Sequence, residues 1–151
     1  MKRLALLRTL LEREQKRRDE QMAAVRNAVA NAQAQQQQAD GLGGYRTEYC
    51  AKWSAQFRQA ATMDILRSYQ GFLSRLDQAI SQQTSVVEHA HRMVEAQRQR
   101  LVEREIRVAT VERLIKRREA MLAKVADRRD QKNLDELAQR LVSARSQAGL
   151  S

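Results

Sequence analysis

The chain has 151 residues, no proline and 30% charged side chains, whereas only 4% of its residues are aromatic. This mixture, rich in alanine, leucine, glutamine and arginine, is typical of long solvated helices. It excludes an ordinary globular core, because too few large apolar side chains are present to fill one.

The single cysteine, Cys50, excludes an intramolecular disulfide, and no histidine or cysteine near it has the spacing of zinc ligands. A reducing cytosol fits this cysteine usage. Residues 1–8 begin like a signal peptide, but the charges from Glu12 to Asp19 interrupt the apolar run too early. No later stretch is long and apolar enough to span a membrane. We therefore expect a soluble intracellular protein with no transmembrane segment.

Apolar residues at three- and four-residue spacing predict a first helix over about residues 3–57. The stripe is interrupted at Glu14 and Arg18 and then continues into an aromatic row. Its members are Leu4, Leu7, Leu11, Met22, Val25, Val29, Ala32, Leu42, Tyr45, Tyr49, Trp53 and Phe57.

Two segments are candidates for the turn that follows this helix. Gly41, Gly43 and Gly44 are strong helix breakers, whereas residues 59–64 have weaker turn chemistry, with Thr62 or Asp64 as a possible N-cap. The periodicity continues across the glycines, so we predict the turn at about residues 58–64. The glycines then soften the helix at a cost of roughly 1 kcal/mol each.

A sustained heptad pattern from Leu66 to Val125 predicts a second helix over about residues 65–147. Fourteen of the eighteen positions on its stripe are apolar, and the phase breaks at residues 127–133 before three leucines restart it. Those leucines are Leu134, Leu137 and Leu141. The predicted fold is an all-α, antiparallel two-helix coiled-coil hairpin that forms a single domain over residues 1–151.

Charge is distributed unevenly along this hairpin. Residues 1–26 hold eight Lys/Arg against four Asp/Glu and residues 98–151 hold fourteen against eight, while residues 27–97 hold six of each. An antiparallel hairpin brings the two basic segments together at the end opposite the turn. The net charge of +10 is therefore concentrated at one end, which favours an anionic partner over a merely solvated surface.

Aromatic residues are confined to the other end, since all six lie within residues 45–72. Around Phe72, Leu76 and Ala79 a second apolar stripe lies beside the seam, so this face is wider than one partner helix can cover. Leu42, Tyr45 and Tyr49 supply a matching row on the first helix, and they appear in the sequence at helical spacing. Apolar, tyrosine-rich surface left over after folding is typical of a protein-docking site.

The sequence carries no pattern that predicts catalysis, a metal or a cofactor. His89 and His91 are two residues apart and point to different sides of a helix, so they cannot jointly hold a metal. Residues 41–44 lack the preceding strand and the following Lys/Ser of a phosphate-binding loop. A two-helix hairpin also has no enclosed pocket in which pKa values could be tuned, so we predict that the chain is not an enzyme.

Three blocks of the sequence resemble the flagellar type III export protein FliJ family: residues 45–49, residues 69–83 and residues 130–140. They read Tyr-Arg-Thr-Glu-Tyr, Tyr-Gln-Gly-Phe-Leu-Ser-Arg-Leu-Asp-Gln-Ala-Ile with Gln82 and Gln83 after it, and Asp-Gln-Lys-Asn-Leu-Asp-Glu-Leu-Ala-Gln-Arg. The resemblance implies an antiparallel coiled coil similar to the gamma-subunit stalk of rotary ATPases, with the turn after the tyrosine block.

The resemblance also implies the partners. The basic end would enter the pore of the hexameric flagellar export ATPase, and the aromatic end would bind the cytoplasmic region of the export gate protein FlhA. The protein would further escort export chaperones and lie peripherally at the inner-membrane export apparatus. The family's gate-binding residues correspond to Gln38, Leu42, Tyr45, Tyr49, Phe72, Leu76 and Ala79. The basic residues that we expect at the ATPase ring are Arg13, Lys16, Arg17, Arg18, Arg117, Arg118, Arg128, Arg129 and Lys132.

The chain departs from the family pattern at Gln83, where some relatives carry histidine, and at Gly43 and Gly44, where relatives are helical. Two other functions remain open: a basic coiled coil that binds nucleic acid or a membrane surface, and the equivalent stalk of a virulence type III secretion system. The basic segments contain no aromatic or glycine-rich interleaving for stacking on bases, so no nucleic-acid partner is expected.

Overall fold

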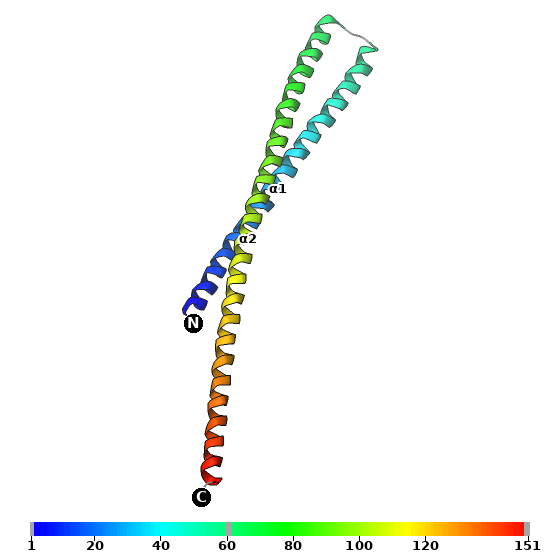
Figure 1. The fold of residues 1–151 in the computed structure, drawn as a ribbon. Helices are drawn as coiled ribbons and strands as arrows, with labels where there is room; N and C mark the ends of the chain where they lie inside the picture. Colours follow the sequence, from blue (N-terminus) through cyan, green and yellow to red (C-terminus); the bar gives the residue numbers. More distant parts are fainter. Residues whose placement is uncertain (1, 60–61, 150–151) are drawn as a thin grey trace. The chain divides into compact units, whose positions relative to one another are not determined.

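The computed structural model describes residues 2–59 and 62–149. Helix α1 extends over Lys2–Phe57 and helix α2 over Met63–Gly149, and the described residues contain no strand. The two helices run in opposite directions and pack against each other (Figure 1). The predicted all-α, two-helix hairpin is therefore confirmed.

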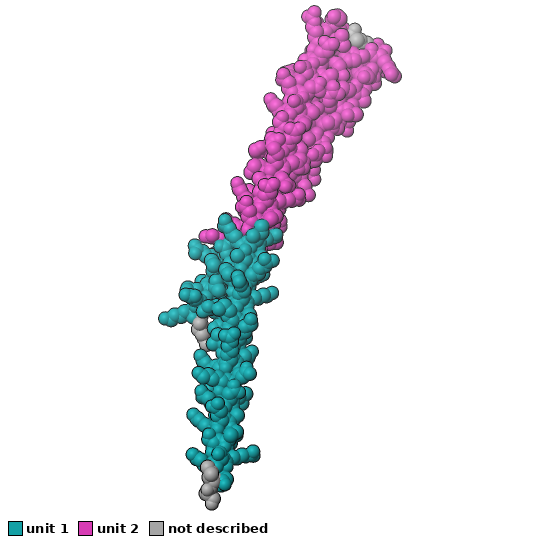
Figure 2. All heavy atoms as spheres, in the orientation of Figure 1, with its two compact units in different colours: residues 1–16, 105–151 teal, residues 17–104 magenta. Residues whose placement is uncertain are grey.

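The chain divides into two compact units, which Figure 2 shows in different colours. Unit 1 consists of residues 1–16 and 105–151, and unit 2 consists of residues 17–104. Each unit thus contains a segment of α1 and a segment of α2.

Helix α1 continues without interruption through its glycine-rich segment, Gly41, Gly43 and Gly44. None of the three has a positive φ. A Cβ built on any of them would meet no atom within 4 Å beyond the adjacent residues and the backbone of the same helix. The glycines are therefore ordinary helical residues here, and the first of the two candidate turns is not used. The predicted turn at about residues 58–64 includes residues 60 and 61, which lie outside the described residues.

The flanks of the turn are described and show a capped start of α2. The Ile65 backbone N–H donates a hydrogen bond to Thr62 Oγ1 at 3.3 Å, and the Leu66 N–H donates to the Thr62 carbonyl at 3.1 Å. Thr62 is thus the N-cap of α2, as one of the two predictions, Thr62 or Asp64, had it. Asp64 places a negative charge in the first turn, where the helix dipole favours it.

The core of each unit is a narrow seam of small and β-branched side chains. In unit 2 the buried residues Ala32, Ala90 and Val94 pack together, with Ala28 and Val29 against them. Alanines let the two backbones approach closely, which explains how a chain with so few large apolar residues closes a seam. In unit 1 the buried apolar residues are Val108, Val111 and Ile115, and the side chain of Glu14 is also buried.

Two glutamine pairs interrupt this seam in unit 2. Gln83 Nε2 donates to the Gln35 backbone carbonyl and to Gln35 Oε1, both at 2.9 Å. Gln21 Nε2 donates to the Gln97 carbonyl at 3.0 Å and to Gln97 Oε1 at 2.6 Å. The pairs are two heptads apart on both helices and share one register. Gln83 is buried and the other three glutamines are half-buried. The donated bonds give each pair hydrogen-bond partners where the seam excludes water.

The last part of α2, residues 119–149, is exposed throughout. Leu122 and Val125 lie on the predicted stripe beside the first turns of α1 but remain 37% and 51% exposed. The three leucines that restart the pattern are also exposed, at 56–67%. Within the described residues, neither helix contains a stretch that is long and apolar enough to cross a membrane.

Candidate protein-docking surfaces

The six aromatic side chains gather into one group in unit 2, here called the aromatic cluster. Its members are Tyr45, Tyr49, Trp53 and Phe57 of α1, and Tyr69 and Phe72 of α2. Tyr49 is central, because its ring centroid lies 4.5 Å from that of Phe72, 5.6 Å from Tyr69, 6.0 Å from Trp53 and 6.2 Å from Tyr45. Such spacings are typical of favourable aromatic pairs, so the cluster joins α1 and α2 in this part of unit 2.

One side of the aromatic cluster remains accessible. Tyr45 is 49% exposed, whereas Tyr49 and Trp53 are half-buried. The three rings border a hollow of about 490 Å³ on α1, whose other lining residues are Glu48, Lys52 and Gln56. The hollow therefore combines aromatic walls, which are enriched at protein-binding sites, with charged and amide groups.

The structure brings three of the seven predicted gate-binding residues together in this cluster. Tyr45, Tyr49 and Phe72 are in mutual ring contact, and Gln38 is exposed on α1. Leu42 and Ala79 are half-buried, as are Tyr49 and Phe72.

Leu76 is not exposed, although the sequence predicted it on an exposed second apolar stripe. It is only 7% exposed and belongs to the buried seam, so little of its surface is available to a partner. Gln83, where the family pattern varies, is also buried and hydrogen-bonded to Gln35. Neither residue adds to the accessible surface of the cluster.

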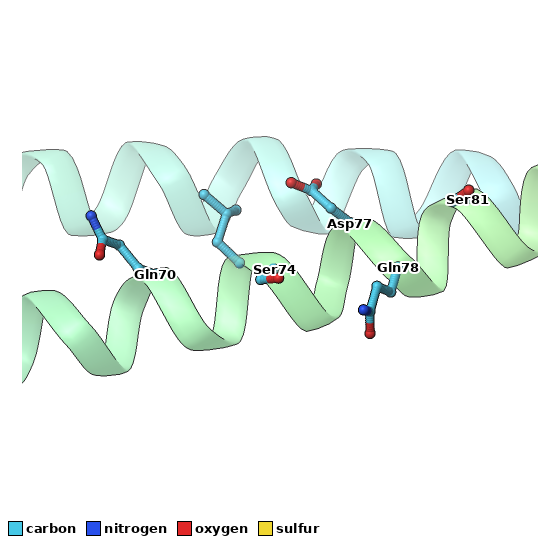
Figure 3. Close-up of a pocket in the computed structure, with 6 residues that line it drawn as sticks. Gln70, Ser74, Asp77, Gln78 and Ser81 are labelled. Carbon is cyan, nitrogen blue, oxygen red and sulfur yellow. The ribbon is translucent and has the colours of Figure 1, made fainter.

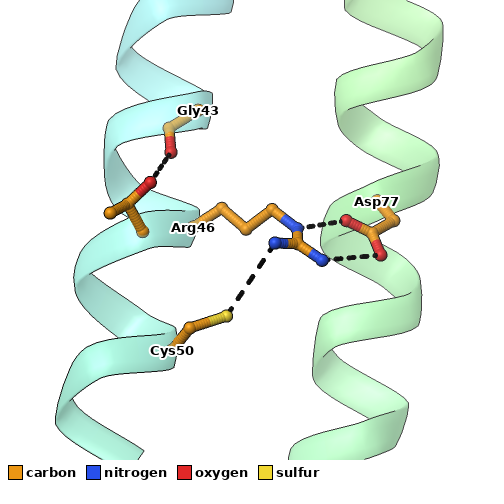
Figure 4. A network of polar contacts seen from close by, with 5 residues as sticks. Gly43, Arg46, Cys50 and Asp77 are labelled. Atoms are coloured by element: carbon orange, nitrogen blue, oxygen red, sulfur yellow. Dashed lines mark hydrogen bonds and ion pairs between the residues drawn. The ribbon is translucent and has the colours of Figure 1, made fainter.

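An ion pair ties the two helices together beside the aromatic cluster (Figure 4). Arg46 donates from Nε to Asp77 Oδ1 at 2.6 Å and from Nη2 to Asp77 Oδ2 at 3.4 Å, so the contact is bidentate. Arg46 Nη1 also lies 4.0 Å from Cys50 Sγ, and the Thr47 hydroxyl donates to the Gly43 carbonyl at 3.1 Å. The hydrogen bond from Arg46 and its positive charge lower the pKa of Asp77.

We expect the contribution of this ion pair to stability to depend on pH. Because folding lowers the pKa of Asp77, the contribution is present above about pH 4 and is lost as the pH falls through the pKa of the folded state. Thermal unfolding of Asp77→Asn and of the unchanged chain should give a Tm difference at pH 7 that shrinks at pH 2.5. Glu48→Gln, another exposed carboxylate on unit 2, serves as the control. A Tm difference for Asp77→Asn that does not change with pH would contradict the role of the ion pair.

The surface near Asp77 also contains polar side chains of α2. A shallow depression lies along α2 there, and Figure 3 shows its polar residues. It is lined by Gln70, Leu73, Ser74, Asp77, Gln78 and Ser81. His89 and His91 are both exposed, and no group of three or more His, Cys, Asp or Glu side chains that could hold a metal occurs in the part of the chain that the structure describes.

The predicted ATPase-ring residues are divided between the two units. Unit 1 contains seven of them, namely Arg13, Lys16, Arg117, Arg118, Arg128, Arg129 and Lys132. Six of these are exposed and Arg118 is half-buried. Arg17 and Arg18 belong to unit 2, where Arg18 donates to Asp19 Oδ1 at 3.1 Å.

Unit 1 also has a surface that the sequence reasoning missed, here called the leucine–arginine groove. It has a volume of about 520 Å³ and is lined by Arg3, Leu6, Leu7 and Leu10 of α1, and by Leu114, Arg117, Arg118 and Met121 of α2. The signal was present in Leu6 and Leu10, which are four residues apart beside the seam stripe of Leu7 and Leu11. Leucines off the stripe indicate a second apolar face on the first helix.

Comparison with known proteins places the chain in a family. No curated protein and no solved structure matches it. The model of the family described as "Flagellar FliJ protein" matches residues 2–147, which is nearly the whole chain. The chain therefore belongs to the flagellar FliJ family and is a component of the flagellar type III export apparatus.

Proposed function

We propose that this chain is the stalk of the flagellar export apparatus and links the export ATPase ring to the export gate. FliJ proteins are non-catalytic export components, so the chain acts through binding. The observation that carries the proposal is the aromatic cluster of unit 2, whose accessible side is bordered by Tyr45, Tyr49 and Trp53. A scaffold of two helices that holds packed aromatic rings at its surface is suited to docking.

The aromatic cluster is the proposed binding surface for the cytoplasmic region of FlhA. Tyrosine and tryptophan dominate the binding energy of many protein interfaces, because a large rigid ring buries much area at a small entropic cost. Tyr45 and Tyr49 are held in place before binding by their ring contacts with Phe72. The ion pair between Arg46 and Asp77 also holds the two helices together beside them. Little conformational freedom is then left to lose when the partner docks.

The basic residues of unit 1 form the proposed surface for the hexameric export ATPase. Exposed arginines and lysines complement an acidic surface and raise the rate and specificity of association. The same proposal includes the escort of export chaperones and a peripheral position at the inner membrane. It rests on membership of the FliJ family together with the distribution of charge.

The gate-binding role is tested with the variant Leu42→Ala/Tyr45→Ala/Phe72→Ala. We expect its affinity for the purified cytoplasmic region of FlhA, measured by isothermal titration calorimetry, to fall by at least about tenfold. Circular dichroism should show unchanged helicity, because the buried seam residues Leu76, Ala90 and Val94 are left in place. The control Leu134→Ala/Leu137→Ala/Leu141→Ala removes three exposed apolar side chains from unit 1 and should bind normally. An unchanged affinity of the first variant would contradict the assignment.

A nucleic-acid-binding function would give a different result. All six aromatics lie in residues 45–72 of unit 2, so the basic segments have no rings on which bases could stack. Binding to duplex DNA or RNA that is tight at low salt and falls steeply with added salt, together with no affinity for the ATPase or for FlhA, would favour the alternative function.

A further inference from the structure

The leucine–arginine groove is an apolar depression between two helices that the seam does not fill. Leu6 is 69% exposed and Met121 is 57% exposed, and Leu10 and Leu114 are also exposed. These four side chains belong to α1 and α2 in unit 1, so they form the two walls of one groove. Contiguous exposed apolar surface of this kind is typical of an interaction site.

The charge around the groove has one sign. The three charged residues among its eight lining residues are all arginines, Arg3, Arg117 and Arg118, and none is acidic. Arg118 Nε is also buried and has no hydrogen-bond acceptor among the described residues. Arg3 and Arg117, by contrast, are exposed, so their guanidinium groups can meet a carboxylate brought by an occupant. Charge-assisted bonds between arginine and a carboxylate are strong and can be bidentate.

The shape of the groove favours a helix over a membrane surface as its anionic partner. A depression between two packed helices accepts the apolar ridge of a third helix, which would bury its leucines in the same way as a small bundle does. A membrane surface would contact the two rims rather than fill the depression. We propose that the leucine–arginine groove binds an amphipathic helix of a partner protein, with leucine-type residues on its apolar face and carboxylates on both flanks of that face.

This proposal goes beyond the proposed stalk function, because it needs neither the ATPase ring nor the gate. Arg117 and Arg118 belong both to the groove and to the basic surface proposed for the ring. The apolar walls belong to the groove alone. Substitutions of Leu6 and Met121 therefore test the groove while leaving every arginine and lysine of unit 1 in place.

The experiment uses the full chain and a synthetic probe. The probe is a fluorescein-labelled peptide of about 18 residues, long enough to form a helix, with leucines at positions i, i+3, i+4 and i+7 and glutamates flanking them. A matched peptide carries lysine in place of every glutamate. We expect fluorescence anisotropy to show binding of the acidic peptide only. Leu6→Gln/Met121→Gln should weaken this binding by at least about tenfold, and Arg117→Gln should weaken it less.

A matched control separates the groove from general attraction between opposite charges. Leu134→Gln/Leu141→Gln changes two leucines that are exposed in the same unit but lie outside the groove, and it should bind the acidic peptide normally. Equal weakening in both double variants, or no weakening in either, would overturn the proposal. Binding of vesicles of phosphatidylcholine and phosphatidylglycerol that depends on Leu6 and Met121, without peptide binding, would overturn it in favour of a membrane. Binding to the ATPase ring is measured separately, so failure of the stalk function would leave the peptide result unaffected.

Discussion

Replacing Gly41, Gly43 and Gly44 together with alanine should stabilise the protein by about 2–3 kcal/mol. All three are interior residues of α1 with helical backbone, and an added Cβ at each would meet no atom within 4 Å. Alanine therefore removes backbone freedom from the unfolded chain and adds no steric cost. Urea denaturation followed by circular dichroism measures the gain as a shift in the free energy of unfolding.

Gly149→Ala is the matched control, because Gly149 is the last residue of α2 and has equally open surroundings. A helix end contributes little to stability, so this change should leave the free energy of unfolding the same within about 0.5 kcal/mol. A loss of stability in the triple variant would mean that the chain needs a non-helical conformation at residues 41–44. The glycines also precede Tyr45, so hydrogen exchange near the aromatic cluster should slow in the triple variant.

Replacing Leu76 with alanine should destabilise the protein by about 2–4 kcal/mol. Leu76 is 7% exposed and lies in the buried seam of unit 2, so truncation removes apolar burial and leaves a cavity between the helices. Thermal and urea denaturation measure the loss.

Leu134→Ala is the control for the same chemical change at a site that is 67% exposed, and it should alter stability by less than about 0.5 kcal/mol. The comparison also separates packing from docking. If Leu76→Ala kept full stability but lost affinity for FlhA, Leu76 would be a docking residue. Its assignment to the buried seam would then be wrong.

The seam was predictable from sequence because burial of one face imposes a heptad period. The buried residues from Leu76 to Ile115 lie on the predicted stripe, including Gln83, although its polarity alone favours a surface position. The uninterrupted helix at residues 41–44 was predictable for the same reason, since the stripe keeps its phase across the glycines.

Accessibility of the candidate sites was harder to predict, because periodicity does not say which of two neighbouring stripes faces the partner helix. Near the aromatic cluster the sequence also placed Leu76 on the second apolar stripe, whereas its burial assigns it to the seam and Tyr45 stays exposed. The leucine–arginine groove depends on which residues of α2 lie opposite Leu6 and Leu10. That pairing depends on the register between the first turns of α1 and the facing part of α2. The heptad pattern of each helix does not specify this register.

The two glutamine pairs of unit 2 have a mechanical consequence. A slide of one heptad along the seam would move Gln35 from Gln83 to Leu76 or Ala90, and the second pair would be lost in the same step. Each buried amide left without a partner costs about 1–3 kcal/mol. The short connection between the helices opposes the same displacement. Unit 2 should therefore resist shear along its axis, so that a force applied to one helix is carried by both.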